Sequence, residues 1–114
     1  MIIYEVTLEI DFEIIEEFQN WLIEHVNEML ATRCFTSAEI FTETPKLLPA
    51  DGANSRDSNH LNQSKAVVIH YKVGSESDLN EYFLRHASRL RAPAVRQFGA
   101  KFRAKRRVLK LGLS

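Results

Sequence analysis

Apolar and polar residues alternate over the first ten positions of the chain. One side of this segment is apolar and carries Ile2, Tyr4, Val6, Leu8 and Ile10. The opposite side carries Ile3, Glu5, Thr7 and Glu9. A period of two residues, with β-branched side chains among them, is typical of a half-buried strand. The pattern therefore predicts a strand over residues 2–10.

The next segment has the period of an α-helix. Its apolar positions share one face and are Ile15, Phe18, Leu22, Val26 and Met29. Acidic residues gather near its start, where the positive end of the helix dipole stabilises negative charge. Asp11 has a side chain suited to cap the first turn. We predict an amphipathic helix that follows Asp11 and ends near Ala31.

Three more strands are predicted in the rest of the chain, with a long polar segment between the first two of them. Strands are predicted over residues 34–43, 65–73 and 101–111. Pro, Asn, Ser, Asp and Gly concentrate in residues 44–64, which we expect to form a flexible loop.

A second helix is predicted between Gly74 and the last strand. Ser75 followed by Asp78 resembles a capping box, Pro93 is expected to break or restart the helix, and Gly99 is expected to end it. Its expected buried face carries Leu79, Phe83, His86 and Leu90.

The order β-α-β-β-α-β predicts one α+β domain over residues 1–114. It is the order of the ferredoxin-like, or split β-α-β, arrangement, in which two helices cover one face of an antiparallel sheet. The other face of such a sheet would then be uncovered. We expect a homodimer in which two of these faces close into a barrel, and the alternative is a solvated polar face.

Charge is distributed unevenly along the 114 residues, although 15 basic and 15 acidic residues give no net charge. Residues 1–60 contain 12 acidic and 3 basic side chains, and residues 61–114 contain 3 and 12. A basic end of this kind can bind nucleic acid or another anionic partner. It can also pair with the acidic first strand, which places Glu5 and Glu9 opposite residues from Arg103, Lys105 and Arg107. We favour the pairing and expect no nucleic-acid partner.

Other compositional features exclude several classes of protein. The single Cys34 rules out an internal disulfide framework and a multi-cysteine zinc site. No apolar window approaches the ~18–20 residues of a membrane helix, and the N-terminus does not resemble a secretory signal. We therefore expect a cytoplasmic protein that binds no membrane and needs no cofactor.

Five segments together resemble a known family. They are M-I-I-Y-E-V at 1–6, W-L-I-E-H-V-N-E-M-L-A-T at 21–32, F-T-S-A at 35–38, R-H-A-S-R-L-R-A at 85–92 and F-G-A-K-F-R-A-K-R-R-V-L at 98–109. These blocks are similar to an uncharacterised bacterial family catalogued as domain of unknown function 4286. The resemblance implies a dimeric α+β barrel and no established activity. The long segment 44–64 and Cys34 depart from the family's usual pattern.

Two histidines are the first candidates for a functional site. His25 and His86 both lie on predicted buried stripes that face the same sheet, so they could meet in one pocket. We predict a ligand-binding site there, formed by Trp21, His25, His86, Arg89 and Arg91. Alternatively, both imidazoles are structural groups that bond to backbone or tyrosine hydroxyls. A metal site is not expected, because His25, Glu28 and His70 match no ligand motif.

Three functions remain open from the sequence. In the first, the protein binds a small organic ligand. In the second, it is a cofactor-independent enzyme, monooxygenase-like or isomerase-like, with His25 or His86 as acid or base. In the third, its basic end binds a nucleic acid or another anionic partner. The monooxygenase comparison is incomplete, since Asn20 and Trp21 are adjacent and lie about 100° apart around a helix. Whether the protein is an enzyme is not decided by its sequence.

Overall fold

A computed structural model describes residues 1–44, 47–49 and 63–113 of the chain. The sheet is formed by β1 (Ile2–Asp11), β2 (Phe35–Thr42), β3 (Ser64–Val73) and β4 (Phe102–Lys110). The helices are α1 (Ile15–Ala31), α3 (Glu76–Arg85) and α4 (Ala87–Phe98). Short 3-10 turns, η1 (Phe12–Ile14) and η4 (Gly99–Lys101), precede α1 and β4. The four predicted strands and the first predicted helix are present in this part of the chain, and the predicted second helix is divided into α3 and α4.

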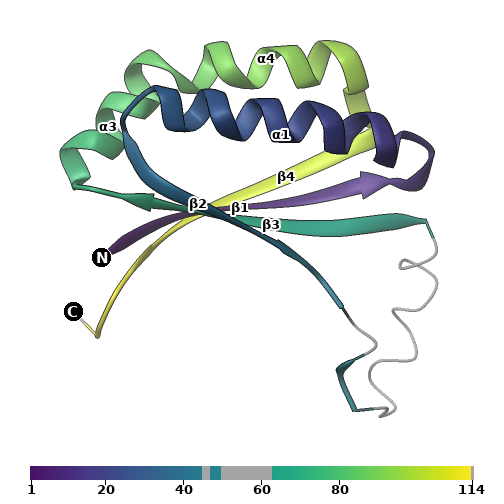
Figure 1. The fold of residues 1–114 in the computed structure, drawn as a ribbon, viewed down its shortest axis with the longest axis horizontal. Helices are drawn as coiled ribbons and strands as arrows, with labels where there is room; N and C mark the ends of the chain where they lie inside the picture. Colours follow the sequence, from purple (N-terminus) through teal and green to yellow (C-terminus); the bar gives the residue numbers. More distant parts are fainter. Residues whose placement is uncertain (45–46, 50–62, 114) are drawn as a thin grey trace.

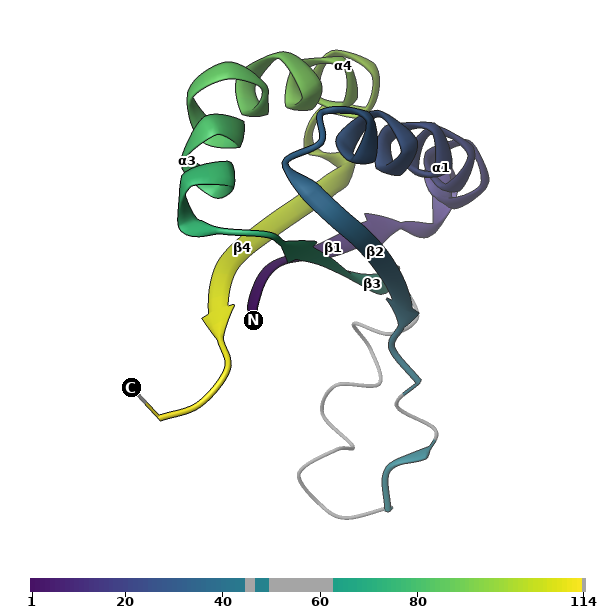
Figure 2. The ribbon, with the colours of Figure 1, turned by 60° about the vertical axis from the view of Figure 1, so that its left-hand side comes forward.

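The four strands form one antiparallel sheet in the order β2-β3-β1-β4. β1 therefore lies in the middle, between β3 and β4. All three helices lie on the same side of the sheet, with α1 beside α4 (Figure 1, Figure 2). The α+β class and the antiparallel sheet are thus confirmed.

The hydrophobic core lies between the sheet and the helices. The buried side of β1 carries Tyr4, Val6, Leu8 and Ile10, as its period of two predicted. The buried side of α1 carries Phe18, Leu22, Val26 and Met29, as its helical period predicted. These two faces meet because each element has one apolar side that water disfavours.

Opposite charges face each other along β1 and β4. Glu5 is paired with Arg107 and Glu9 with Arg103, while Lys105 lies opposite Thr7. The Arg107 Nε donates to a Glu5 carboxylate oxygen at 2.5 Å. The predicted pairing of the acidic and basic ends is confirmed for these two pairs, and it fixes the register of the first and last strands.

Arg103 is also shared with the end of β1. Its Nη2 atom lies 2.9 Å from Asp11 Oδ1 and 3.7 Å from Glu9 Oε1. Asp11 was expected to cap the first helix, and this prediction is wrong, because its side chain makes no capping hydrogen bond. Its carboxylate accepts from the Arg103 guanidinium instead.

The second helical region differs from its prediction in the position of its break and in the aromatic residue that it buries. Ser75 caps α3 by accepting a hydrogen bond from the Asp78 backbone N–H, and Gly99 ends α4 with a φ of 57°. Pro93, however, lies inside α4, and the break falls at His86, where φ and ψ are −123° and −33°. The expected break at Pro93 is therefore wrong. Tyr82 is buried in place of Phe83, which is 43% exposed.

Two further expectations concern the segment 44–64 and membrane-spanning helices. Most of the expected flexible loop at 44–64 lies outside the described residues. Among the helices of the described part, none is long and apolar enough to span a bilayer.

Candidate ligand-binding cavity

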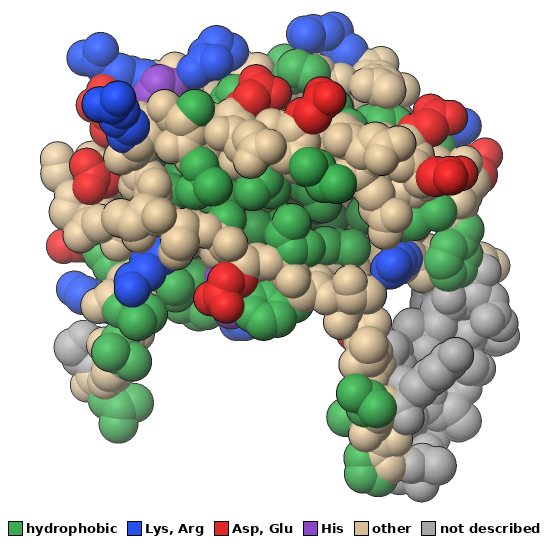
Figure 3. Space-filling view, in the orientation of Figure 1, with side chains coloured by type: hydrophobic (Ala, Val, Ile, Leu, Met, Phe, Trp, Pro, Cys, Tyr) green, Lys and Arg blue, Asp and Glu red, His purple; other side chains and the backbone are tan. Residues whose placement is uncertain are grey.

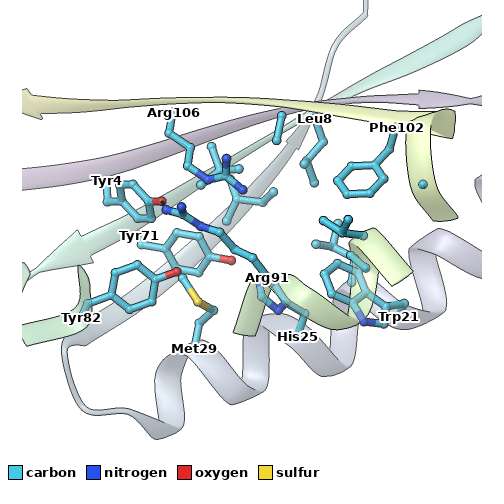
Figure 4. A pocket seen from close by; sticks show the side chains of 17 residues that line it. Tyr4, Leu8, Trp21, His25, Met29, Tyr71, Tyr82, Arg91, Phe102 and Arg106 are labelled. Atoms are coloured by element: carbon cyan, nitrogen blue, oxygen red, sulfur yellow. Dashed lines mark hydrogen bonds between the residues drawn. The ribbon is translucent and has the colours of Figure 1, made fainter. Parts of the chain in front are cut away.

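A cavity of about 310 Å³ lies between the sheet and the helices. Its walls come from β1, β3 and β4 on one side and from α1, α3 and α4 on the other. One end is apolar and is lined by Leu8 and Phe102 (Figure 4). The volume is at the lower end of the roughly 300–1,000 Å³ typical of small-molecule sites.

Three tyrosines form the other end of the cavity. Tyr4 on β1 and Tyr71 on β3 are cross-strand partners, and Tyr82 joins them from α3. The rings pack against one another, with the Tyr4 centroid 5.6 Å from that of Tyr82. Burial raises the pKa of Tyr82 to about 12 and also raises that of Tyr71. Both phenols therefore keep their protons at neutral pH and can donate hydrogen bonds.

Two guanidinium groups reach the same cavity from opposite sides. Arg91 comes from α4, and its Nη2 atom donates to the Tyr4 hydroxyl at 2.9 Å. Its Nε atom is shielded from solvent and has no hydrogen-bond partner among the described residues. Arg106 approaches from β4 (Figure 4). Of the described residues that line the cavity, none is acidic.

Trp21 and His25 lie one helical turn apart on α1 and both line the cavity. Their rings are stacked, with centroids 4.5 Å apart and planes 17° apart. Burial is the main cause that lowers the pKa of His25 to about 4, and the charges of Arg106 and Arg91 add to it. The imidazole is therefore neutral at pH 7 and has a nitrogen free to accept a proton.

The other two predicted site residues lie elsewhere. His86 sits at the junction of α3 and α4, and its Nδ1 atom is 2.7 Å from Nη2 of Arg89. Neither residue is among those that line the cavity. The fold thus brings together Trp21, His25 and Arg91 and separates them from the other two residues. The role of these three residues in binding stays a prediction.

Four polar residues of the cavity were not predicted from the sequence. They are Tyr4, Tyr71, Tyr82 and Arg106. Arg106 carried a readable signal, because it alternates with Phe102 and Ala104 on the side of β4 that faces the helices. An arginine at an inward position of a strand suggests a role inside the fold. The sequence pattern did not distinguish the three tyrosines from other aromatic residues expected in the core.

The face of the sheet away from the helices carries a row of charged residues. Glu39, His70, Glu5 and Arg107 lie side by side across all four strands. The His70 Nε2 atom is 2.8 Å from Glu5, and the Phe41 ring contacts His70 edge-on at 5.1 Å. The hydrogen bond from Arg107 is the main cause that lowers the pKa of Glu5. This carboxylate is therefore ionised at neutral pH.

The same face is arched between two projections, one at the end of β4 and one beyond β2 (Figure 3). Exposed apolar side chains lie on both projections, namely Leu47 and Leu48 beyond β2, and Leu111 and Leu113 beyond β4. Among the described residues, no three His, Cys, Asp or Glu side chains are grouped as metal ligands would be.

Comparisons with known proteins identify a family and a fold. A family model described as a domain of unknown function (DUF4286) matches residues 1–111. Among curated proteins, none matches the chain. The solved structure of the de novo designed protein Foldit4 is similar with a TM-score of 0.51 at 12% identity, over 96% of both chains. A second de novo design, Ferredog-Diesel, matches at a TM-score of 0.40 and 17% identity, over 90% of this chain and 83% of that one. At such identities the likeness to Foldit4 concerns the fold alone.

Proposed function

Because the chain belongs to the DUF4286 family, whose description assigns no activity, we infer its function from the cavity. We propose that the protein binds a small organic anion between its helices and its sheet. The head of the ligand, a carboxylate or a similar group, would contact Arg91 and Arg106. Its apolar body would lie against Leu8, Phe102 and Trp21.

The observation that carries this proposal is the state of Arg91. Its guanidinium is half-buried and donates to the Tyr4 hydroxyl, and its Nε atom is shielded from solvent without a hydrogen-bond partner among the described residues. The described lining contains no acidic residue that could accept from it. A donor shielded from water without an acceptor is unfavourable. A second guanidinium, from Arg106, adds to the positive charge. An anion supplied from outside would compensate both groups and accept from the free Nε donor.

The same residues favour binding over catalysis. A general base works best when its pKa lies near the working pH, and His25 with a pKa of about 4 is far below neutrality. The described lining also contains no cysteine or serine that could act as a nucleophile. A monooxygenase-like or isomerase-like enzyme therefore remains the alternative, with His25 as its base, because His86 lies outside the cavity.

A charge-matched pair of ligands tests the proposal. Trp21 is the chain's single tryptophan and lines the cavity, so its fluorescence reports occupancy directly. We expect phenylacetate to change this fluorescence with a Kd of about 0.1–1 mM, the range for a ligand of about ten heavy atoms. Phenylacetamide has the same shape without the charge and should bind at least about tenfold more weakly. Equal affinities for the acid and the amide, or no response to either, would reject an anion site.

We also assign the domain to the ferredoxin-like arrangement and to the dimeric α+β barrels. The strand order β2-β3-β1-β4, with all helices on one face, supports the first assignment. The uncovered face and the exposed leucines at its two ends support a homodimer that closes over this face.

The charges of the uncovered face suit a second copy. On that face the edge strand β2 presents Glu39, and the opposite edge strand β4 presents Lys105, whose partner on β1 is the uncharged Thr7. A two-fold axis parallel to the strands would place β2 of one copy over β4 of the other. The acidic edge would then meet the basic edge twice, as an isologous interface requires.

Sedimentation at several protein concentrations would measure the association. We expect a dimer that weakens when Lys105→Glu removes a positive charge from the basic edge. Arg96→Glu is the matched control, because Arg96 is exposed on α4 at the far side of the sheet and should leave the dimer intact. A monomer at all concentrations, or equal effects of both variants, would contradict this interface.

Other partners and the compartment follow from the same contacts. Arg103 and Arg107 are already paired with acidic side chains, so they offer little to a nucleic acid. Cys34 is a buried free thiol, which suits the reducing environment of the cytoplasm. We keep the cytoplasm as the proposed compartment.

A further inference from the structure

We propose that the cavity takes up a proton on His25 when it binds its anion, so that binding strengthens as the pH falls. The inference rests on the proposed function, because it needs an anion in the cavity. It concerns regulation of that site: the ligand would be held more tightly in an acidic environment and released as the pH rises.

The charged side chains that share the described lining of the cavity with His25 are all positive. Across the cavity it faces Arg91 from α4 and Arg106 from β4 (Figure 4). The remaining titratable groups of the lining are the phenols of Tyr4 on β1, Tyr71 on β3 and Tyr82 on α3. On α1 itself, the acidic neighbours Glu24 and Glu28 are exposed. The described lining of the empty cavity thus offers nothing negative to stabilise an imidazolium.

An incoming carboxylate changes this balance. It brings a negative charge next to the two guanidiniums that repel a proton on His25. It can also accept a hydrogen bond from the charged ring. A carboxylate within ~4–6 Å typically raises the pKa of a histidine by about one to three units. The shift would bring His25 from about 4 into the range of mildly acidic conditions.

The sign of the pH dependence follows from linkage. If the ligand raises the pKa of His25, then a proton on His25 must raise the affinity for the ligand by the same factor. Above about pH 7 the imidazole is neutral with or without ligand, and affinity is constant. Between about pH 7 and 5 the bound form takes up a proton and the free form does not. Affinity should therefore rise roughly three- to tenfold over this window.

Calorimetry with phenylacetate as the probe tests the coupling. Its carboxyl group stays largely ionised above about pH 5, so the ligand itself adds little pH dependence. Titrations at pH 5.5 in two buffers with different heats of ionisation measure the protons exchanged on binding. We expect an uptake of about half a proton per ligand by the wild type. His25→Gln should bind without proton uptake and with an affinity that is flat between pH 7.5 and 5.5.

A second measurement covers the case in which His25→Gln fails to fold. The imidazole resonances of the wild-type protein, followed by NMR, should titrate at higher pH with phenylacetate than without it. Binding of phenylacetate with no proton uptake and no shift of this titration would overturn the coupling and leave the anion site standing. Proton uptake that persists in a folded His25→Gln variant would also overturn it. Absence of phenylacetate binding would reject both.

Discussion

Replacing Arg91 with methionine is expected to weaken phenylacetate binding at least about thirtyfold, or roughly 2 kcal/mol. The variant should be as stable as the wild type or more stable. Methionine keeps most of the apolar length of the side chain and removes the charge. Binding loses its main donor group, measured by Trp21 fluorescence, while folding no longer has to shield an Nε atom from water without a hydrogen-bond partner.

The combination of lost binding and kept stability is what distinguishes a ligand site from a structural contact. Arg91 also donates to the Tyr4 hydroxyl, and a purely structural role would make that bond important for folding. Thermal unfolding of Arg91→Met would then show a clear loss of stability. Arg89→Met is the matched control, since Arg89 lies on the same helix, outside the cavity and exposed. It should change neither binding nor stability appreciably.

Replacing Glu5 with lysine is expected to lower the free energy of unfolding by about 2–3 kcal/mol. The Glu5 side chain is only 11% exposed and accepts hydrogen bonds from both Arg107 and His70. A lysine would remove both contacts and place like charges on the central and edge strands. The effect stays below that of a fully buried pair because the Arg107 side chain is 67% exposed, and solvent screens its charge.

Two variants test whether the charge pair or the position itself matters. Adding Arg107→Glu to Glu5→Lys restores opposite charges and should recover part of the lost stability. Glu24→Lys is the control, because Glu24 is exposed on α1, away from this face of the sheet; it should change stability by less than about 0.5 kcal/mol. Unfolding is measured at two protein concentrations, because loss of a dimer would depend on concentration. Equal losses from Glu5→Lys and Glu24→Lys would contradict a role for the pair.

Strand positions and the pairing of the first and last strands could be predicted from the sequence because local patterns and the order of the elements determine them. β1 alternates apolar and polar residues apart from Ile3, so its buried side was known before its neighbours. The ferredoxin-like order pairs the first and last strands antiparallel, which places Glu5 and Glu9 opposite residues from Arg103, Lys105 and Arg107. The structure adds the register, in which Glu5 is paired with Arg107 and Glu9 with Arg103.

The cavity could be predicted only in part because it depends on a helix break that the sequence does not mark. Proline was the visible signal, yet Pro93 is accommodated within α4 and the backbone departs from helical geometry at His86. A continuous helix would have kept His86 in line with Leu79 and Leu90. The break instead buries Tyr82 and Ala87 and leaves His86 outside the cavity, in contact with Arg89. Arg91, seven residues before the end of α4, then faces the cavity.

The central place of β1 has a consequence for how the chain folds. Both neighbours of β1 come much later in the sequence: Asp11 pairs with Ser64, and Ile2 pairs with Lys110. Each pairing closes a long loop of chain, which requires a loss of conformational entropy before any contact compensates it. Of the three strand pairs, β2 and β3 are separated by the fewest residues along the chain, whereas β1 pairs only with strands that are distant in the sequence. Folding of this domain is therefore expected to be slow for its length, with β4 docking on β1 as the step that completes the sheet.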